Sequence, residues 1–278
     1  MTSNYSRLID STHGERKLPM RVLVLGMCRT GTTSIATALR KLGYTTHTMR
    51  SVLSQPSQIT LWQEAVNLTL LQPRPKSSFY PPYTRTEFDK LLGDFDAVTD
   101  IPSAVFAEQL IEAYPEAKVI LTVRNYDDWE HSMNESIWCL FTWRLFGLAR
   151  ICGVTQMAPM MRMLHSVFQA HNGNVYGGPK AKEAYEAHNA KIMKLVPKEN
   201  LLVLEEPVTD WTWEALCEFL GKQAPKDVFP KMDEDRALRR SLETVWWGMV
   251  RYLFLLLTLP GSVILGAVIF FMGGKHLV

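Results

Sequence analysis

The chain is poor in cysteine and shows no strong excess of charge of either sign. Its 278 residues include 4 cysteines, with no C-x-x-C pair and no histidine cluster at metal-ligand spacing. We therefore expect a reduced compartment and no metal site. The 30 Lys and Arg residues against 28 Asp and Glu leave a net charge of +2. This balance, without a long basic block, argues against nucleic-acid binding.

The N-terminus lacks the apolar stretch of a signal peptide. Residues 1–19 are polar and charged, so we predict a flexible N-terminal segment and no cleaved leader. Hydrophobic residues make up 47% of the chain, and no internal repeat is visible. A chain of this length and composition supports one large core, and we place a single domain over residues 20–235.

An apolar stretch, Arg21–Leu25, runs into a loop of glycine and hydroxyl residues, Gly26–Ser34. Two glycines five positions apart allow a tight turn whose backbone N–H groups point inward. A helix that begins near Thr32 adds its positive N-terminal end. The pattern predicts a phosphate-binding loop, although a Gly- and Thr-rich turn of another α/β protein has the same composition.

The loop lacks residues that two common nucleotide-binding motifs require. The NTPase motif G-x-x-x-x-G-K-[ST] has a lysine where this chain has Thr32, and the cation stands at Arg29 instead. The shift argues against a ligand that gives up a γ-phosphoryl group. The dinucleotide motif G-x-G-x-x-G is also absent, because Gly26 is followed by Met27 and Cys28.

The rest of the chain alternates between apolar strands and amphipathic helices. We predict strands over Tyr44–Met49, Asp96–Asp100, Ala117–Val123 and Leu201–Leu204. We predict helices over Ser34–Leu42, Leu53–Leu71, Phe88–Leu92, Ser103–Tyr114, Asp127–Gly147, Lys180–Leu195 and Trp211–Leu220. Successive strand–helix units indicate an α/β fold with a three-layer parallel sheet.

Residues that follow each strand are candidates for ligand binding, because ligands of open parallel sheets bind beyond the carboxyl ends of the strands. Thr99–Pro102 follows one predicted strand and Arg124–Ser132 follows another. In the second segment, the guanidinium of Arg124 and the hydroxyl of Ser132 are suited to holding a second phosphate. Pairing of Arg124 with a carboxylate at the start of the next helix, Asp127 or Asp128, is the alternative.

Taken together, these segments resemble the sulfotransferase family, which uses 3'-phosphoadenosine 5'-phosphosulfate (PAPS) as sulfuryl donor. The segment Arg29-Thr30-Gly31-Thr32-Thr33 is similar to the family's K-S-G-T-T loop, and Thr99–Pro102 is similar to its T-H-L-P segment. Arg124–Ser132 is similar to its R-N-P-K-D-x-x-x-S stretch. The likeness is greatest to the branch common in fungi. It implies a phosphate-binding-loop fold, PAPS as co-substrate, a small-molecule acceptor and no metal.

The resemblance also implies a donor site, with the 5'-phosphosulfate on the loop and the 3'-phosphate on the later segment. Its predicted members are Cys28, Arg29, Thr30, Gly31, Thr32, Thr33, Ser34, Arg124 and Ser132. Arg29 is also a predicted catalytic residue, because charge builds on the bridging oxygen that leaves the sulfur.

The acceptor hydroxyl needs a group that takes its proton in the transition state. Where soluble family members carry a catalytic histidine, this chain has Asp100, which serves as a base only if it stays ionised beside the acceptor. A strand-end cap or a group that orients the ligand is its alternative role. His47, after the second predicted strand, is the next candidate for the base, and a structural role is its alternative.

The C-terminal part differs in composition. Tyr252–Met272 runs 21 residues without a charge, roughly 30 Å as a helix and the thickness of a bilayer core. Arginines and tryptophans precede it. We predict a basic linker and membrane anchor over residues 236–278, single-pass, with the catalytic domain facing the cytosol. A re-entrant hairpin or interfacial helix bent at Pro260-Gly261 and a buried core helix are the alternatives.

The sequence leaves several possibilities open for the class of acceptor and for the reaction. An anchor suits a lipophilic acceptor, and the candidate lining residues are aromatic: Trp62, Phe79, Tyr80, Tyr83, Trp138 and Trp143. One alternative keeps the fold but changes the chemistry, for example sulfonation followed by elimination in a biosynthetic pathway. Another is a membrane-tethered nucleotide-binding protein without turnover. No oligomeric state is predicted.

Overall fold

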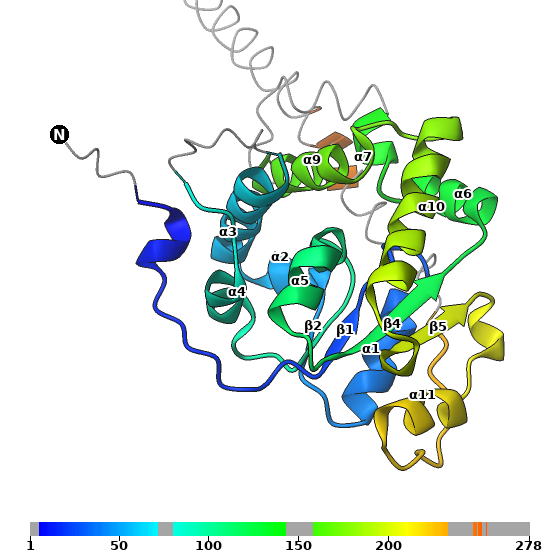
Figure 1. Ribbon diagram of the computed structural model, residues 1–278. Coiled ribbons are helices and arrows are strands. Elements are labelled where there is room, and N and C mark those ends of the chain that lie inside the picture. Colours follow the sequence, from blue (N-terminus) through cyan, green and yellow to red (C-terminus); the bar gives the residue numbers. More distant parts are fainter. Residues whose placement is uncertain are drawn as a thin grey trace, which may run out of the picture.

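A computed structural model describes residues 6–71, 80–142, 158–232, 247–248, 250–251 and 254 (Figure 1). Its centre is a parallel sheet with the strand order β2-β3-β1-β4-β5. The strands are β1 (Val22–Val24), β2 (Thr46–His47), β3 (Ala97–Val98), β4 (Lys118–Val123) and β5 (Leu201–Glu205). The predicted α/β fold with a parallel sheet is confirmed.

Helices cover both faces of the sheet, because the buried strands carry apolar side chains on each side. Leu23 and Leu25 pack into the core beneath α5 (Ala107–Ala113) and α10 (Gly178–Leu195). Figure 1 shows these two helices in front of the sheet. Val22 and Val24 point to the other face, which is covered by two further helices. These are α1 (Thr32–Lys41) and α11 (Trp213–Leu220).

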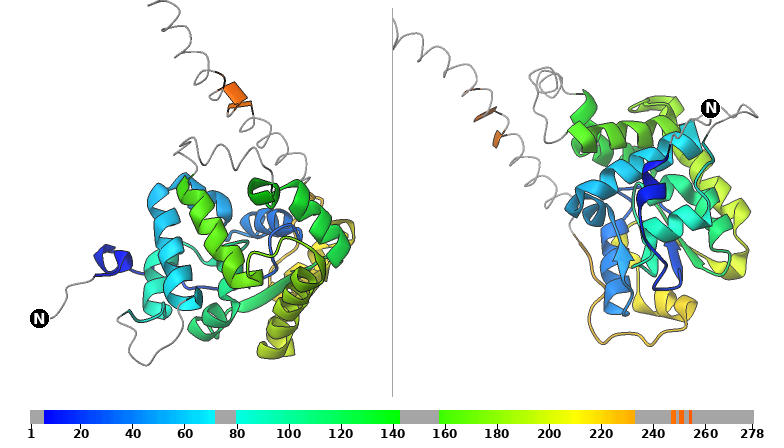
Figure 2. Two further views of the ribbon diagram at one scale, coloured as in Figure 1. Left: turned by 90° about the horizontal axis from the view of Figure 1, so that it is seen from above. Right: turned by 90° about the vertical axis from the view of Figure 1, so that its left-hand side faces the viewer.

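The remaining helices extend the front layer. They are α2 (Met49–Ser54), α3 (Pro56–Val66), a π-helical turn (Asn67–Leu71), α4 (Arg85–Leu92), α6 (Tyr126–Glu135), α7 (Cys139–Thr142) and α9 (Ala158–Asn172). Short 3-10 helices cover Leu8–Ser11, Ser103–Phe106, Lys198–Asn200 and Val208–Asp210. Helices α3 and α9 pack side by side, as Figure 2 shows.

Several predicted helices are shorter than expected. The single helix predicted over Leu53–Leu71 is interrupted at Gln55, which has extended backbone angles. A residue before proline disfavours the helical region, so α3 begins afresh at Pro56. The helix predicted over Asp127–Gly147 ends at Glu135, and α7 follows as a separate short helix.

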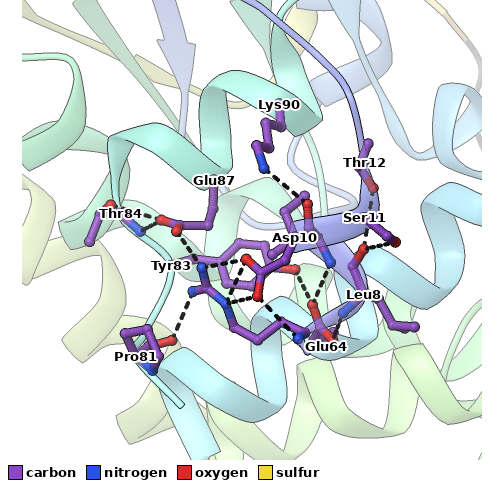
Figure 3. A network of polar contacts seen from close by, with 12 residues as sticks. Leu8, Asp10, Ser11, Thr12, Glu64, Pro81, Tyr83, Thr84, Glu87 and Lys90 are labelled. Atoms are coloured by element: carbon purple, nitrogen blue, oxygen red, sulfur yellow. Dashed lines mark hydrogen bonds and ion pairs between the residues drawn. The ribbon is translucent and has the colours of Figure 1, made fainter. Parts of the chain in front are cut away.

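The N-terminal segment differs from the flexible chain that its polarity predicts. Within it, the side chain of Ile9 is fully buried, and Arg7 Nη2 lies 2.8 Å from Glu87 Oε1 on α4. The carboxylate of Glu64 on α3 accepts hydrogen bonds from the backbone N–H groups of Leu8 (2.6 Å) and Ile9 (3.1 Å), a network drawn in Figure 3. These contacts tie the segment to the front layer.

The predicted membrane segment lies outside the described residues, apart from Phe254. Among the residues that the structure does describe, none of the helices combines the length and apolar character needed to cross a membrane. Residues 72–79 of the predicted surface loop and residues 143–147 at the end of a predicted helix also fall outside the described part.

Candidate functional site

The loop Gly26–Ser34 crosses closely over the neighbouring strand. Leu25 still pairs with β4, since its N–H donates to the carbonyl of Ile120 at 2.9 Å. A Cβ at Gly26 would lie 2.0 Å from the hydroxyl oxygen of Thr122 and 2.4 Å from its carbonyl oxygen. Only glycine fits here, because any side chain would overlap the backbone of β4.

Hydrogen bonds from other segments fix the shape of this loop. The Thr30 hydroxyl donates to the carbonyl of Met27 (2.7 Å) and lies 2.6 Å from the hydroxyl of Thr122 on β4. The indole N–H of Trp129 on α6 donates to the carbonyl of Cys28 at 2.8 Å. All of these groups are buried, so the loop is held in one conformation before any ligand arrives.

The loop ends at the N-terminus of α1. Gly31 is the N-cap, with φ +84°, and the hydroxyl of Ser34 in the first turn accepts from the N–H of Met232 at 3.0 Å. Among the described residues, none accepts a hydrogen bond from the backbone N–H of Gly31 or Thr32. Free N–H groups at the positive end of a helix suit an anion such as a phosphate or a sulfuryl group.

Arg29 lies within this loop with its side chain turned toward α6. It is 7% exposed, and its Nε donates to the hydroxyl of Ser132 at 3.0 Å. The resemblance assigns these two residues to opposite ends of one nucleotide, whereas the structure joins them by a hydrogen bond. Ser132 therefore orients the guanidinium of Arg29.

The side chain of Arg124, which follows β4, contacts the loop that carries Arg29. Its Nη1 donates to the carbonyl of Arg29 at 3.3 Å. Its backbone is fixed by Tyr185 on α10, whose hydroxyl accepts from the Arg124 N–H and donates to the Arg124 carbonyl, both at 3.0 Å. The two arginines predicted to share one ligand thus lie together at the carboxyl end of the sheet.

The charge partner of Arg124 is Glu206, which our sequence analysis missed. Its Oε2 lies 2.9 Å from Arg124 Nε, an ion pair in which the N–H is not aligned for a hydrogen bond. Asp127 instead has its own N–H capped by the side chain of Asn125 at the start of α6. The signal for Glu206 was available, since it lies just after the apolar run Leu201–Leu204 and directly follows β5, as Arg124 directly follows β4.

Asp100 ends the strand β3 in a tight turn. Its φ is +71°, its side chain is half-buried, and its Oδ1 accepts from the N–H of Ile101 at 2.8 Å. Its carbonyl accepts from the N–H of Ala104 at 3.0 Å. The carboxylate thus caps the strand end.

His47 is enclosed at the end of β2. It is 1% exposed, and its ring lies 5.0 Å from that of Phe95 and 5.6 Å from that of Trp62, centre to centre. Neither ring nitrogen has a hydrogen-bond partner among the described residues. Burial lowers the pKa of His47 to about 3, so the ring is neutral at pH 7.

Three of the four described aromatic residues that were proposed to line an acceptor pocket belong to the core. Trp62 and Trp138 are fully buried, and Tyr83 is 2% exposed. Tyr80 is half-buried, and Phe79 and Trp143 lie outside the described residues. The described part also contains no group of three or more His, Cys, Asp or Glu residues that is placed to hold a metal ion.

Two of the predicted site residues have unusual backbone angles. Arg29 (φ +70°) and Asp100 (φ +71°) both adopt the left-handed region that favours glycine. Such strain costs about 1–3 kcal/mol and gathers at functional sites, where the surrounding structure holds it in place. Of the three described non-glycine residues with positive φ, these two belong to the predicted site, and the third is Asn174.

Comparison with known proteins agrees with this geometry. A family model described as a sulfotransferase domain matches residues 21–238, and the chain belongs to that family. The chain is also similar to Ava biosynthesis cluster protein M of Aspergillus versicolor. The two are 33% identical over 233 residues, which cover 82% of this chain and 86% of that protein. Membership of the family supports a transferase activity of the sulfotransferase type.

Proposed function

We propose that the protein transfers a sulfuryl group from PAPS to a hydroxyl group of a small, lipophilic acceptor. The observation that carries the proposal is the hydrogen bond from Arg124 Nη1 to the carbonyl of Arg29, at 3.3 Å. It brings the guanidinium of Arg124 to the backbone of the loop that carries Arg29 and the free N–H groups of Gly31 and Thr32. A doubly phosphorylated adenosine needs such a pair of anion sites.

In the proposed donor complex, the 5'-phosphosulfate rests on the N–H groups of Gly31 and Thr32 and on the hydroxyl of Thr33. The guanidinium of Arg124 faces the 3'-phosphate. The other proposed donor-site residues are Cys28, Arg29, Thr30, Ser34 and Ser132, and the contacts of the last three support the shape of the loop.

The reaction is an in-line displacement at sulfur. The acceptor oxygen forms a bond to sulfur while the bond from sulfur to the 5'-phosphate oxygen breaks, and adenosine 3',5'-bisphosphate leaves. Arg29 stabilises the negative charge that builds on the leaving oxygen. Asp100 takes the proton of the acceptor hydroxyl. His47 is less suited to this step, because its ring is enclosed and its pKa is lowered to about 3.

The test is transfer of labelled sulfate from PAPS to a panel of lipophilic phenols and alcohols. The printed name of the similar protein refers to a biosynthesis cluster, which supports a small-molecule acceptor. We expect a labelled product with wild type and a large loss with Arg29→Ala, while Arg85→Ala, an exposed arginine on α4, remains active. Equal transfer by all three proteins would contradict the assignment.

One contact favours a second candidate function, binding of a nucleotide without turnover. Glu206 partly neutralises Arg124, the side chain that is proposed to face the 3'-phosphate. A protein of this kind would bind adenosine 3',5'-bisphosphate but release no sulfated product from PAPS. Release of a desulfated, unsaturated product would instead indicate sulfonation followed by elimination.

We also propose that residues 236–278 anchor the protein to a membrane, with the rest of the chain on the cytosolic side. The support is the uncharged run Tyr252–Met272 and the arginines before it. Carbonate extraction of membranes that contain the full chain should leave it in the pellet, and a chain that ends at Lys231 should be released. Release of both would contradict the proposal.

A further inference from the structure

Two aromatic rings, those of Trp129 on α6 and Tyr185 on α10, lie stacked behind the phosphate-binding loop and Arg124. Their ring centres are 4.3 Å apart, and their planes are inclined by 24°. Trp129 is fully buried and Tyr185 is 2% exposed, so protein encloses both rings. Figure 1 shows the two helices next to each other near the carboxyl end of β4. These residues therefore act on a bound donor through the groups that they hold.

The polar group of each ring is bonded to a different half of the proposed donor site. The indole N–H of Trp129 donates to the carbonyl of Cys28 in the loop at 2.8 Å. The hydroxyl of Tyr185 accepts from the N–H of Arg124 and donates to the carbonyl of the same residue, both at 3.0 Å. Burial raises the pKa of Tyr185, so the hydroxyl keeps the proton that it donates. One stacked pair thus connects the loop with Arg124.

A second contact follows one helical turn after each ring. On α6, the hydroxyl of Ser132 accepts from the Nε of Arg29 at 3.0 Å. On α10, His188 Nε2 donates to the carbonyl of Leu25, directly before the loop, at 2.8 Å. Residues three apart lie on the same face of a helix, so each helix turns one face toward the donor site. The site is therefore held from two helices whose rings are in contact.

The stacked pair fixes the distance between the two halves of the site. Enclosed rings cannot slide past each other without opening a gap in a close-packed core. In the proposed donor complex, the loop takes the 5'-phosphosulfate and Arg124 faces the 3'-phosphate. We propose that Trp129 and Tyr185 are positioning residues, which set the spacing of these two anion sites and with it the selectivity for a 3',5'-bisphosphate. The selectivity rests on the proposed sulfuryl transfer, whereas the coupling of the two segments does not.

Tyr185→Phe tests the role at Arg124, because it removes only the hydroxyl. Calorimetric titration with adenosine 3',5'-bisphosphate and with ADP gives two dissociation constants for each protein. We expect the preference for the bisphosphate to fall about fivefold, the scale of a lost hydrogen bond, while binding of ADP stays near that of wild type. An unfolded fraction lowers the stoichiometry but leaves this ratio unchanged, so the ratio separates positioning from a loss of stability. An unchanged preference would overturn the proposal.

Tyr126→Phe is the matched control, because its ring belongs to the same cluster. The ring centre of Tyr126 lies 5.9 Å from that of Trp129 and 6.1 Å from that of Tyr185. Its hydroxyl lies 3.0 Å from Glu130 Oε1 and 3.1 Å from the carbonyl oxygen of Gly178, and among the described residues it bonds to neither anion site. We expect this variant to keep the wild-type preference. An equal fall in both variants would mean that the cluster acts only through its packing, and the proposal would fail.

Hydrogen exchange of the full chain tests the coupling without any ligand. Tyr185→Phe should speed exchange several-fold in the peptides that cover the loop, and Trp129→Phe, which lacks the indole N–H, should speed it at Arg124. Changes confined to the segment that each side chain bonds directly would refute the coupling. If wild type binds neither nucleotide, the proposed sulfuryl transfer and the selectivity fail, and exchange still decides whether the two segments are coupled.

Discussion

The carboxyl end of the sheet has two halves of different character. The loop edge comprises the ends of β1 and β4 with Arg29, Thr30 and Arg124, each of which is hydrogen-bonded to another segment. The β2–β3 edge comprises the ends of β2 and β3. There, the buried His47 nitrogens and the hydroxyl of Thr99 have no hydrogen-bond partner among the described residues.

This difference matches the two substrates of the proposed reaction. A polar loop edge whose residues are hydrogen-bonded to other segments is suited to a highly charged donor, because its groups need little rearrangement when the anion binds. At the β2–β3 edge, the neutral ring of His47 packs against Phe95 and Trp62, and the half-buried residue Asp100 follows β3. In the proposed reaction, this edge receives the less polar acceptor. Four predictions test this division.

The largest effect is expected for Asp100→Asn at the β2–β3 edge. Loss of the base should reduce kcat about 10²–10⁴-fold, while affinity for adenosine 3',5'-bisphosphate stays near that of wild type. Asp94→Asn is the matched control, because that carboxylate is exposed and pairs only with Lys17 in the described structure. Full activity of Asp100→Asn, measured with labelled PAPS, would restrict Asp100 to its capping role.

Arg29→Ala at the loop edge should reduce kcat about 10²–10³-fold, because charge on the leaving oxygen loses its stabilising donor. Arg29→Lys keeps the charge but lacks the planar fork that bonds to Ser132, so we expect an intermediate loss. Both rates come from single-turnover transfer assays. If the alanine variant retained the wild-type rate, Arg29 would have no part in the chemistry.

Acid should destabilise the protein through its enclosed histidines. Burial lowers the pKa of His47 and of His171 to about 3, whereas an unfolded histidine titrates near 6.5. Between these values the unfolded chain binds protons that the folded chain does not. The free energy of unfolding should therefore fall as the pH drops from about 6.5 to 3, by about 1.4 kcal/mol per pH unit for each ring.

Urea unfolding at a series of pH values measures this slope. His47→Leu should reduce the slope by about the share of one ring, because the unfolded variant binds one proton fewer over that range. An unchanged slope would mean that His47 takes up its proton in the folded state, and that the β2–β3 edge is open to water.

The smallest effect is expected at Glu206. Glu206→Gln removes the carboxylate that partly neutralises Arg124, so adenosine 3',5'-bisphosphate should bind about fivefold more tightly, the scale of a partly exposed ion pair. Calorimetry measures the change. Weaker binding would show that the main contribution of Glu206 is to position the guanidinium.

The sheet and the phosphate-binding loop could be predicted because their signals are local. Apolar runs define the strands, and the Gly26 and Gly31 spacing defines the loop. The break before Pro56 was also predictable, since a residue before proline rarely stays helical. By contrast, contacts between distant segments leave no periodic trace in the sequence. The hydrogen bond of Arg29 to Ser132 and the ion pair of Arg124 with Glu206 are of this kind.

The packing of the N-terminus was unpredictable for a similar reason. Arg7 and Ile9 stand among polar residues without helical or strand periodicity, and their partners on α3 and α4 lie more than 50 positions away. Burial of one isoleucine and pairing of one arginine hold the N-terminal segment against the domain, and composition predicts neither contact. The neutral state of His47 likewise follows from the rings that enclose it and from no motif.

The most direct test of the account is calorimetric titration of the full chain with adenosine 3',5'-bisphosphate and, separately, with ADP. The two ligands carry the same number of phosphates in different places, and in the proposed complex only the first has one phosphate on the loop and a separate phosphate at Arg124. The account predicts that adenosine 3',5'-bisphosphate binds at least about tenfold more tightly, a difference of about 1.4 kcal/mol. Equal, weak binding of the two would contradict it.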